Sequence, residues 1–278
     1  MTDQTVALVT GATRGVGKGV VLALCEAGFT VYFTGRTSRA DGPAGSKEPK
    51  GSLEQTQEEA GALGGSAIPI RCDHLDDEQT RSVIERIAAE QGRLDVLVNN
   101  AWGGYEYLNR GEYQFAGAPS WARPISLWDE MFQAGPRAHY ATTALAAPLL
   151  MSTSGALVVT ISFFAGEAFR GDVIYSLAKA ASTQLAAHFA AELQPHGVTS
   201  VALYPGLVRT ESVLAAGDFF DLSNSESPQF IGRAISALAH DPDKLARTGR
   251  TLVAADLALE YGFTDVDGTQ PRSIRSEF

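Results

Sequence analysis

The feature of the sequence that most restricts the fold is a regular alternation between short apolar runs and longer segments of helical periodicity. Seven runs rich in β-branched and aromatic residues follow one another: Thr5–Thr10, Thr30–Thr34, Ser66–Arg71, Leu94–Asn99, Ala156–Ser162, Val198–Tyr204 and Thr251–Ala254. Between them, apolar residues recur at helical spacing in segments such as Gly17–Ala27, Asp77–Gln91 and Ile174–Leu193. Nearly continuous apolar runs are typical of parallel strands covered on both faces. The pattern predicts an α/β fold of the Rossmann type, with a doubly wound, mostly parallel seven-stranded sheet between two layers of helices.

Composition limits the classes of partner. The chain has 278 residues, a formal net charge of -10, two cysteines and five histidines. One α/β domain can hold this length, so we expect a single domain over residues 1–278. The acidic balance argues against nucleic acid or an anionic membrane as the main partner. The cysteines are expected to be reduced core thiols, and no metal site is expected. The sequence shows no signal peptide or membrane-spanning run, so we expect a cytoplasmic protein.

Three long segments interrupt the alternation, and each follows the carboxyl end of an expected strand. They are Thr37–Ser52, Trp102–Pro124 and Pro205–Ser227. In an open α/β sheet ligands bind at this edge, so the segments are expected to be lids, although surface decoration is an alternative. Their aromatic content favours a small to medium, fairly apolar substrate. The tail Ala255–Phe278 is expected to cover the site or a partner subunit.

A glycine-rich turn after the first strand predicts a dinucleotide site. Glycines in that place allow a tight turn and a close approach to a pyrophosphate, and the helix that follows offers free N–H groups. The second strand ends at Arg36, where an enzyme that selects NAD tends to have a carboxylate. Together with Arg14, this residue suits a 2′-phosphate, so NADP(H) is the preferred cofactor and NAD(H) remains possible. The turn residues expected to contact the cofactor are Gly11, Thr13, Arg14, Gly15, Val16 and Gly17.

Tyr175 and Lys179 are four residues apart on an expected helix and therefore share a face. Tyr can supply the proton that a developing alkoxide needs, but the ordinary pKa of its phenol is about 10. A neighbouring cation such as Lys179 favours the phenolate. Ser162, at the end of the preceding strand, can hydrogen-bond the carbonyl oxygen. We therefore expect Ser162, Tyr175 and Lys179 to be the catalytic residues.

These motifs resemble those of the short-chain dehydrogenase/reductase family. The resemblance extends over nearly the whole chain and implies a carbonyl reductase or alcohol dehydrogenase that forms a homodimer or homotetramer. Gly35-Arg36, Trp128-Asp129-Glu130 and Ala255-Asp256-Leu257 indicate the branch that resembles dehydrogenase/reductase SDR family member 1. The resemblance also implies further cofactor contacts, from Asp73 to the adenine, from the Asn99-Asn100-Ala101 element, and along the nicotinamide from Pro205, Gly206, Val208 and Thr210.

Two positions depart from the family's pattern. Trp102 stands where the family usually has Gly after Asn-Asn-Ala. The position at which the family often has an Asn that holds a relay water is Gly135, with Gln133 nearby. Gln133 or backbone carbonyls are expected to hold that water instead, and an Asn at position 135 is expected to be tolerated. The missing Asn also leaves an alternative function open, a low-turnover NADP(H)-binding sensor or interaction protein.

Overall fold

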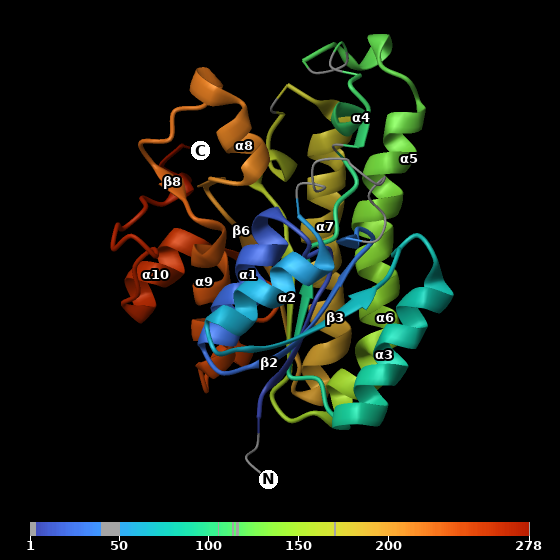
Figure 1. The fold of residues 1–278 in the computed structure, drawn as a ribbon, viewed down its shortest axis with the longest axis vertical. Coiled ribbons are helices and arrows are strands. Elements are labelled where there is room, and N and C mark those ends of the chain that lie inside the picture. The colour runs from blue at the N-terminus through green and yellow to red at the C-terminus, as the bar shows by residue number, and fades with distance from the viewer. Residues whose placement is uncertain are drawn as a thin grey trace.

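A seven-stranded parallel sheet forms the centre of the molecule. The computed structural model describes residues 4–39, 51–104, 106–112, 114, 117–169 and 171–277. The strands lie in the order β3-β2-β1-β4-β5-β6-β9, and all the pairs are parallel (Figure 1). The predicted doubly wound Rossmann-type sheet is thereby confirmed. The strands are β1 (Val6–Val9), β2 (Thr30–Gly35), β3 (Ser66–Arg71), β4 (Val96–Asn99), β5 (Leu157–Ile161), β6 (Thr199–Tyr204) and β9 (Thr251–Val253).

Five of the helices, α2, α3, α7, α8 and α9, begin at a side chain that accepts a hydrogen bond from one of the first free N–H groups. Asp76 caps α3 through Glu78 and Gln79, and Ser227 caps α9 through Phe230. The helices are α1 (Gly15–Glu26), α2 (Leu53–Ala62), α3 (Asp77–Gln91), α4 (Glu106–Asn109), α5 (Ser126–Phe132), α6 (Ala138–Ser152), α7 (Val173–Leu193), α8 (Glu211–Ala215), α9 (Pro228–His240) and α10 (Ala254–Tyr261).

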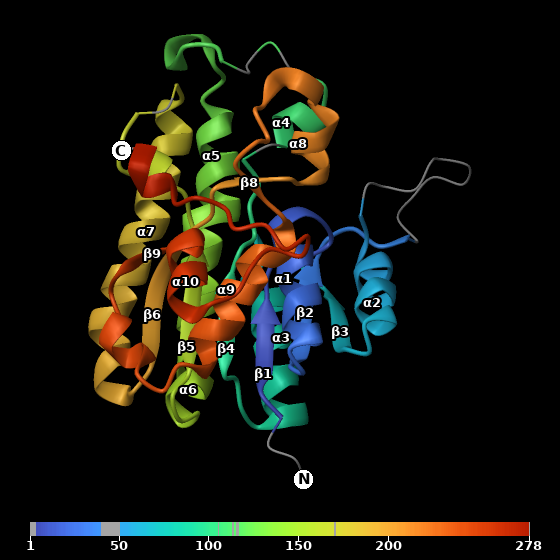
Figure 2. The ribbon, with the colours of Figure 1, turned by 90° about the vertical axis from the view of Figure 1, so that its left-hand side faces the viewer.

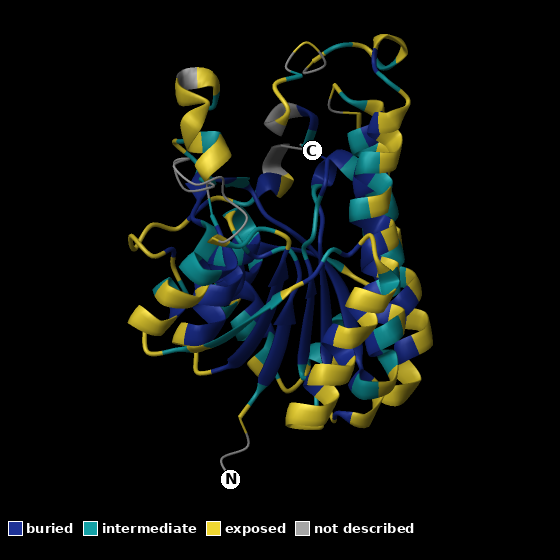
Figure 3. Cartoon of the chain, turned by 45° about the vertical axis from the view of Figure 1, so that its right-hand side comes forward, coloured by how far each residue is buried: buried dark blue, intermediate teal, exposed yellow. Residues whose placement is uncertain are grey.

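Side chains on the two faces of the sheet enter two separate cores. Along β1, Ala7 and Val9 pack with residues of α1 and α9, whereas Val6 and Leu8 pack with residues of α3, α6 and α7. This alternation follows from the two-residue period of a strand. Because both faces are covered, the strands β1, β2, β4, β5 and β6 are buried throughout their length, whereas the edge strand β3 is partly exposed and so are the outer helix faces (Figure 3).

Two of the predicted lid segments, as far as the structure describes them, lie beyond the carboxyl ends of the strands, where α4 and α8 stand in both views (Figures 1 and 2). The segment Trp102–Pro124 contains α4, and Pro205–Ser227 contains α8 and a small parallel pair, β7 (Leu207–Val208) with β8 (Ser225–Glu226). Most of Thr37–Ser52 falls outside the described residues. The lids therefore rise above the edge at which parallel α/β sheets bind ligands.

The tail after α10 returns to this edge. Tyr261 and Phe263 pack into the core, and the Tyr261 hydroxyl donates to Asp241 (2.5 Å). Ile274 is buried beside Gly206. Over the part of the chain that the structure describes, none of the helices is both long and apolar enough to cross a membrane. The same residues contain no group of three His, Cys, Asp or Glu side chains that could hold a metal ion.

Candidate active site

The glycine-rich turn joins β1 to α1 and needs glycine for its shape. Gly11 and Gly15 have φ angles of +68° and +58°, which L side chains rarely adopt. Gly17 has no room for a side chain, because an added Cβ would lie 2.4 Å from Asn100 Nδ2. The turn therefore leads directly into the N-terminus of α1, a place that favours anions.

Asn100 and Ala101 hold the turn from the neighbouring strand end. The Asn100 amide donates to the Thr10 and Gly11 carbonyls, each at 2.9 Å. The Ala101 N–H donates to Thr10 Oγ1 (3.1 Å). The Ala101 Cα would lie 2.7 Å from a Cβ on Gly11, so the β4 end and the turn are in close contact. The structure thus brings these two predicted cofactor residues to the turn, where Asn100 fixes its conformation.

A hollow of about 570 Å³ lies beside the turn, at the ends of β2 and β3. Its lining residues are Arg36, Arg71, Asp73 and Gln79. Sequence reasoning predicted Arg36 and Asp73 but missed Arg71. Arg71 could have been found from strand register, because it is the β3 partner of Gly35 and therefore lies next to Arg36. Guanidinium groups of this kind bind phosphates.

Arg14 does not line this hollow. It is exposed at the N-cap of α1. The segment after β2 has three further cations, Arg39, Lys47 and Lys50. Arg39 donates to Glu58 at 2.9 and 3.0 Å, and the two lysines fall outside the described residues. The hollow is thus lined by two arginines, Arg36 and Arg71, and the role of Arg14 in binding the 2′-phosphate stays a prediction.

Two carboxylates from the segments Trp102–Pro124 and Pro205–Ser227 contact predicted cofactor-binding residues. Glu106, at the start of α4, accepts from the Arg36 guanidinium (2.5 Å). Glu211, at the start of α8, accepts from the Gly15 N–H (2.9 Å). Arg36 and the Gly15 N–H thus both bind carboxylate oxygens in this fold, and the site fits an NAD(P)-type dinucleotide. Thr13 lies against Gly35, and Val16 packs at the edge of the core below the turn.

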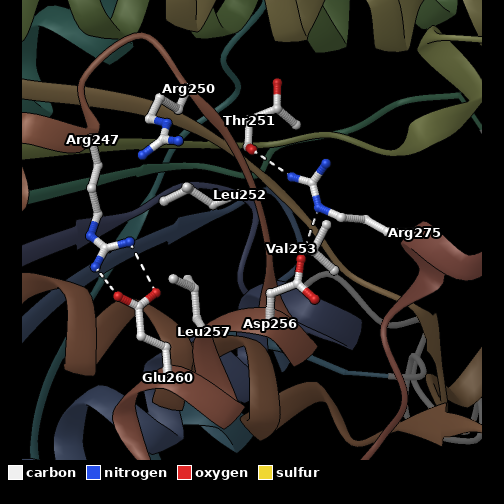
Figure 4. Close-up of a pocket in the computed structure, with 9 residues that line it drawn as sticks. All are labelled: Arg247, Arg250, Thr251, Leu252, Val253, Asp256, Leu257, Glu260 and Arg275. Atoms are coloured by element: carbon white, nitrogen blue, oxygen red, sulfur yellow. Dashed lines mark hydrogen bonds and ion pairs between the residues drawn. The ribbon is translucent and has the colours of Figure 1, made fainter.

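A second arginine-rich hollow, of about 310 Å³, lies at the opposite edge of the sheet (Figure 4). Arg247 bonds the Glu260 and Asp241 carboxylates, and Arg275 bonds Asp256 (2.8 Å) and the Thr251 carbonyl (3.1 Å). The side chains of two of its three arginines thus already have carboxylate partners within the same hollow. It is consequently less suited to an added anion than the hollow at Arg36.

Helix α7 positions Tyr175 and Lys179 on one face. Asp172 caps the helix by accepting from the Tyr175 N–H (3.0 Å). The Asp172 carboxylate also pairs with Arg123, whose side chain is almost fully buried. A lid residue therefore helps to fix the helix start that carries Tyr175.

Ser162 lies directly after β5 and faces the same helix. Its hydroxyl, only 2% exposed, donates to the Lys179 carbonyl (2.8 Å) and accepts from Thr183 Oγ1 (3.1 Å). The fold thus brings the three predicted catalytic residues together. The hydroxyl of Ser162 is held by the backbone of α7 in this arrangement.

The Lys179 side chain is buried against an aromatic ring. Its Nζ lies 3.8 Å from the centroid of the Trp102 ring and 5.5 Å from that of Tyr175. Burial lowers the pKa of Lys179 to about 7. Nearby on α6, His139 donates from Nε2 to the Ala101 carbonyl (3.0 Å), and burial lowers the pKa of His139 to about 3, so it is neutral. This supports a packing role for His139.

Gly135 lies in a π-helical turn, Gln133–Arg137, between α5 and α6. An added Cβ would lie 2.9 Å from Trp102 Cζ3 and 3.1 Å from Cε3. The expectation that Asn at 135 is tolerated is therefore wrong, because the indole would have to move. Gln133 is exposed, which disfavours it as the anchor of a buried water.

The segment Pro205–Thr210 crosses from the end of β6 towards the turn. The Gly206 N–H donates to Glu226 Oε2 (2.9 Å), and Thr210 caps α8 through Val213. Thr210 Cγ2 would lie 3.6 Å from a Cβ on Gly15, so the segment meets the glycine-rich turn. Burial raises the pKa of Glu226 to about 8, and the charge of Asp265 adds to this, whereas the Gly206 N–H and Arg209 act against it. Sequence reasoning missed Glu226, because nothing in the local pattern marks it as buried.

Comparisons with known proteins agree with this arrangement. A family model described as short chain dehydrogenase matches residues 5–218. The chain is 40% identical to dehydrogenase/reductase SDR family member 1 of Mus musculus and 38% identical to that of Homo sapiens. Each alignment covers 95% of this chain and 83% of the relative. Among solved structures, a short chain dehydrogenase of Mycobacterium thermoresistibile has a TM-score of 0.78 at 23% identity, covering 94% of this chain and 89% of the other. That last likeness concerns the fold alone.

Proposed function

The chain belongs to the short-chain dehydrogenase family, and from this premise we propose that it interconverts a ketone or aldehyde and an alcohol by hydride transfer with NADP(H). It is an NAD(P)-dependent oxidoreductase acting on CH–OH or carbonyl groups, as are the members of its family. The predicted family and the branch resembling dehydrogenase/reductase SDR family member 1 are confirmed. The observation that carries the proposal is the meeting, at one edge of the sheet, of the glycine-rich turn with Ser162, Tyr175 and Lys179.

In this proposal the cofactor lies along the carboxyl ends of the strands. The turn residues Gly11–Gly17 and the start of α1 bind the pyrophosphate, and Asp73 meets the adenine. Pro205, Gly206, Val208 and Thr210 line the nicotinamide side, with Asn100 and Ala101 below it. The nicotinamide, when bound, supplies or accepts the hydride.

Tyr175 supplies the proton for the alkoxide in reduction and takes it back in oxidation. Lys179 shares its face of α7 and favours the phenolate by its charge. Ser162 turns its hydroxyl from the Lys179 carbonyl to the substrate oxygen, which it hydrogen-bonds. Thr183, which donates to Ser162, steadies that hydroxyl.

We assign NADP(H) as the preferred cofactor because of the hollow lined by Arg36 and Arg71. A 2′-phosphate is a dianion, and on a chain of net charge -10 it needs local positive charge. Arg36 already binds a carboxylate oxygen of Glu106, which supports its use for a phosphate oxygen.

We assign a small to medium, fairly apolar substrate from the lids. Trp121 and Ile125, near α5, are 89% and 88% exposed, and Phe219, after α8, is 81% exposed. We take these exposed apolar side chains, which lie on or directly after the two segments above the site, as the support for an apolar substrate. The homodimer or homotetramer and the cytoplasmic location expected from the sequence stay predictions.

The test is NADPH consumption by the wild-type protein with ketones, quinones and aldehydes of graded hydrophobicity. We expect turnover that rises with the apolar character of the substrate. NADPH binding without turnover of any of these compounds would overturn the proposal and favour the sensor function instead.

A further inference from the structure

We propose that Trp102 is a positioning residue that holds the Lys179 ammonium on its indole face, so that the ring serves as the counter-group a carboxylate would otherwise provide. The consequence for activity rests on the proposed function. The contact itself does not, and it is tested separately below.

The geometry of the contact supports an electrostatic interaction. Lys179 Nζ lies 3.8 Å from the indole centroid, well inside the range in which a ring face attracts a cation. The same ring meets Tyr175 edge to face, with centroids 5.8 Å apart and an interplanar angle of 86°. One ring therefore contacts both members of the pair on α7.

The surrounding backbone is shaped to admit this ring. A Cβ on Gly104 would lie 2.2 Å from Trp102 Cζ2, and a Cβ on Gly135 would lie 2.9 Å from Cζ3. The Gly103 N–H donates to the Ala134 carbonyl (3.0 Å), which ties the loop to the π-helical turn. Glycines at 104 and 135 thus leave a slot for the indole, and no other residue type fits either place without moving it.

The charge of Lys179 has no carboxylate partner among the described residues. Burial is the only cause of its lowered pKa, and neither a hydrogen bond nor a neighbouring charge contributes to the shift. The titratable groups near Lys179 are Tyr175 on its own helix and His139 on α6. The protonated phenol of Tyr175 and the neutral imidazole of His139 carry no negative charge that could pair with the ammonium. The ring quadrupole is therefore the main attraction that keeps the ammonium charged in a dry place.

The first experiment reads the contact without catalysis. Trp121 and Trp128 are changed to Phe, so that Trp102 is the one remaining tryptophan, and its emission is followed from pH 6 to pH 10. We expect a titration step that disappears when Lys179→Met is added. A flat emission, or a step that survives Lys179→Met, would overturn the contact whatever the enzyme does.

The second experiment reads the consequence. Trp102→Phe keeps a ring face and Trp102→Leu does not, so the two variants form a matched pair. Without the ring the ammonium is less stable, the phenolate of Tyr175 is less favoured, and the rise of kcat/KM with pH in alcohol oxidation moves to higher pH. A cation–π contact of this kind corresponds to a shift of about 0.4 to 1.5 pH units for Leu and less for Phe.

A loss of activity that is equal at every pH in Trp102→Leu, or an equal shift of the pH profile in Trp102→Leu and Trp102→Phe, would show a purely structural role and overturn the inference.

Gly135→Ala offers a further check. Its Cβ would displace the indole, so we expect a shift in the same direction as Trp102→Leu. Gly61→Ala on α2, where an added Cβ meets nothing within 4 Å, is its matched control and should leave the pH profile unchanged. Absence of oxidation in the wild type would refute the proposed function instead, and the emission titration would still decide the contact.

Discussion

The site holds positive charge in two places that differ in their surroundings. At the ends of β2 and β3, Arg36 lies in an open hollow with half of its side chain exposed and a carboxylate beside it. On α7, Lys179 is 9% exposed and lies against an indole face. The first charge is always present, because water and Glu106 both stabilise it. The second depends on its few neighbours, because burial has lowered its pKa to about 7.

This difference indicates two uses of a cation in one site. A charge in water discriminates between ligands through contacts that are modest and screened by salt. A buried charge acts strongly on an adjacent titratable group, and its own ionisation becomes adjustable. We therefore expect changes around Lys179 to alter rate and pH dependence, and changes around Arg36 to alter cofactor choice.

The largest effect is expected at the buried place. Tyr175→Phe keeps the ring and its edge-to-face contact with Trp102 but removes the proton donor. The kcat of carbonyl reduction should fall by about two orders of magnitude or more. The measurement is steady-state NADPH oxidation, with NADPH affinity from fluorescence titration as the control. Turnover close to the wild type would refute the role given to Tyr175, and weakened NADPH binding would indicate a structural defect.

A smaller effect is expected at the exposed place. Arg36→Asp puts a carboxylate where a 2′-phosphate would bind and where a free 2′-OH could donate to it. The ratio of kcat/KM for NADPH to that for NADH should fall at least about tenfold, which corresponds to about 1.4 kcal/mol. Arg39→Asp is the matched control, because Arg39 is already held by Glu58. An unchanged ratio in Arg36→Asp, or an equal fall in Arg39→Asp, would contradict the assignment of the hollow.

Much of this arrangement could be predicted from the sequence, because local patterns determine it. The strand Ser66–Arg71 and the helix Asp77–Gln91 have the predicted bounds, and the other strands agree within two residues at each end. Strands that are covered on both faces have continuous apolar runs in the sequence, and capping residues such as Asp76 mark the starts of helices. The glycine-rich turn and the Tyr175–Lys179 spacing are equally local, so the parts of the site that depend on them were found.

The missed parts depend on contacts between distant segments. Trp102 and Gly135 are 33 positions apart and were each noted as a departure, but only the fold shows that one makes room for the other. Arg71 needed strand register, and Glu226 needed knowledge that its strand lies under Gly206. Arg14 is absent from the lining of the hollow for the same kind of reason, since the direction of a side chain at a turn cannot be read from spacing in the sequence.

A buried group of opposite sign offers a third test of the contrast. The pKa of Glu226 is raised to about 8 in the folded chain. Between the ordinary pKa of a glutamate and pH 8, the carboxyl is therefore protonated in the folded state and ionised in the unfolded state. Its contribution to stability is therefore complete below about pH 4.5 and is lost as the pH rises through 8. Glu226→Gln keeps an oxygen that accepts from the Gly206 N–H. Because the amide does not ionise, this variant does not lose stability as the pH rises through 8.

In urea denaturation, Glu226→Gln should gain at least about 1 kcal/mol relative to the wild type on going from pH 5 to pH 9. The exposed Glu192→Gln on α7 is the control and should show no such gain. A pH-independent difference for Glu226→Gln would mean that this carboxyl is ionised throughout, and burial would then not control ionisation next to Gly206.

The smallest effect is expected where two charges meet in water. Glu106→Gln removes the carboxylate that accepts from Arg36, so a 2′-phosphate no longer competes with it. Exposed ion pairs contribute about 0 to 1 kcal/mol, so NADPH should bind up to about fivefold more tightly, NADH should change little, and the gain should shrink at high salt. Glu112→Gln is the matched control, because Glu112 lies on the same lid and pairs with Arg110 instead. Equal gains for NADPH and NADH would mean that Glu106 closes the lid on any dinucleotide. In that case the Glu106 carboxylate does not occupy the place of the 2′-phosphate. The ion pair between Arg36 and Glu106 would then have no part in discriminating between NADPH and NADH.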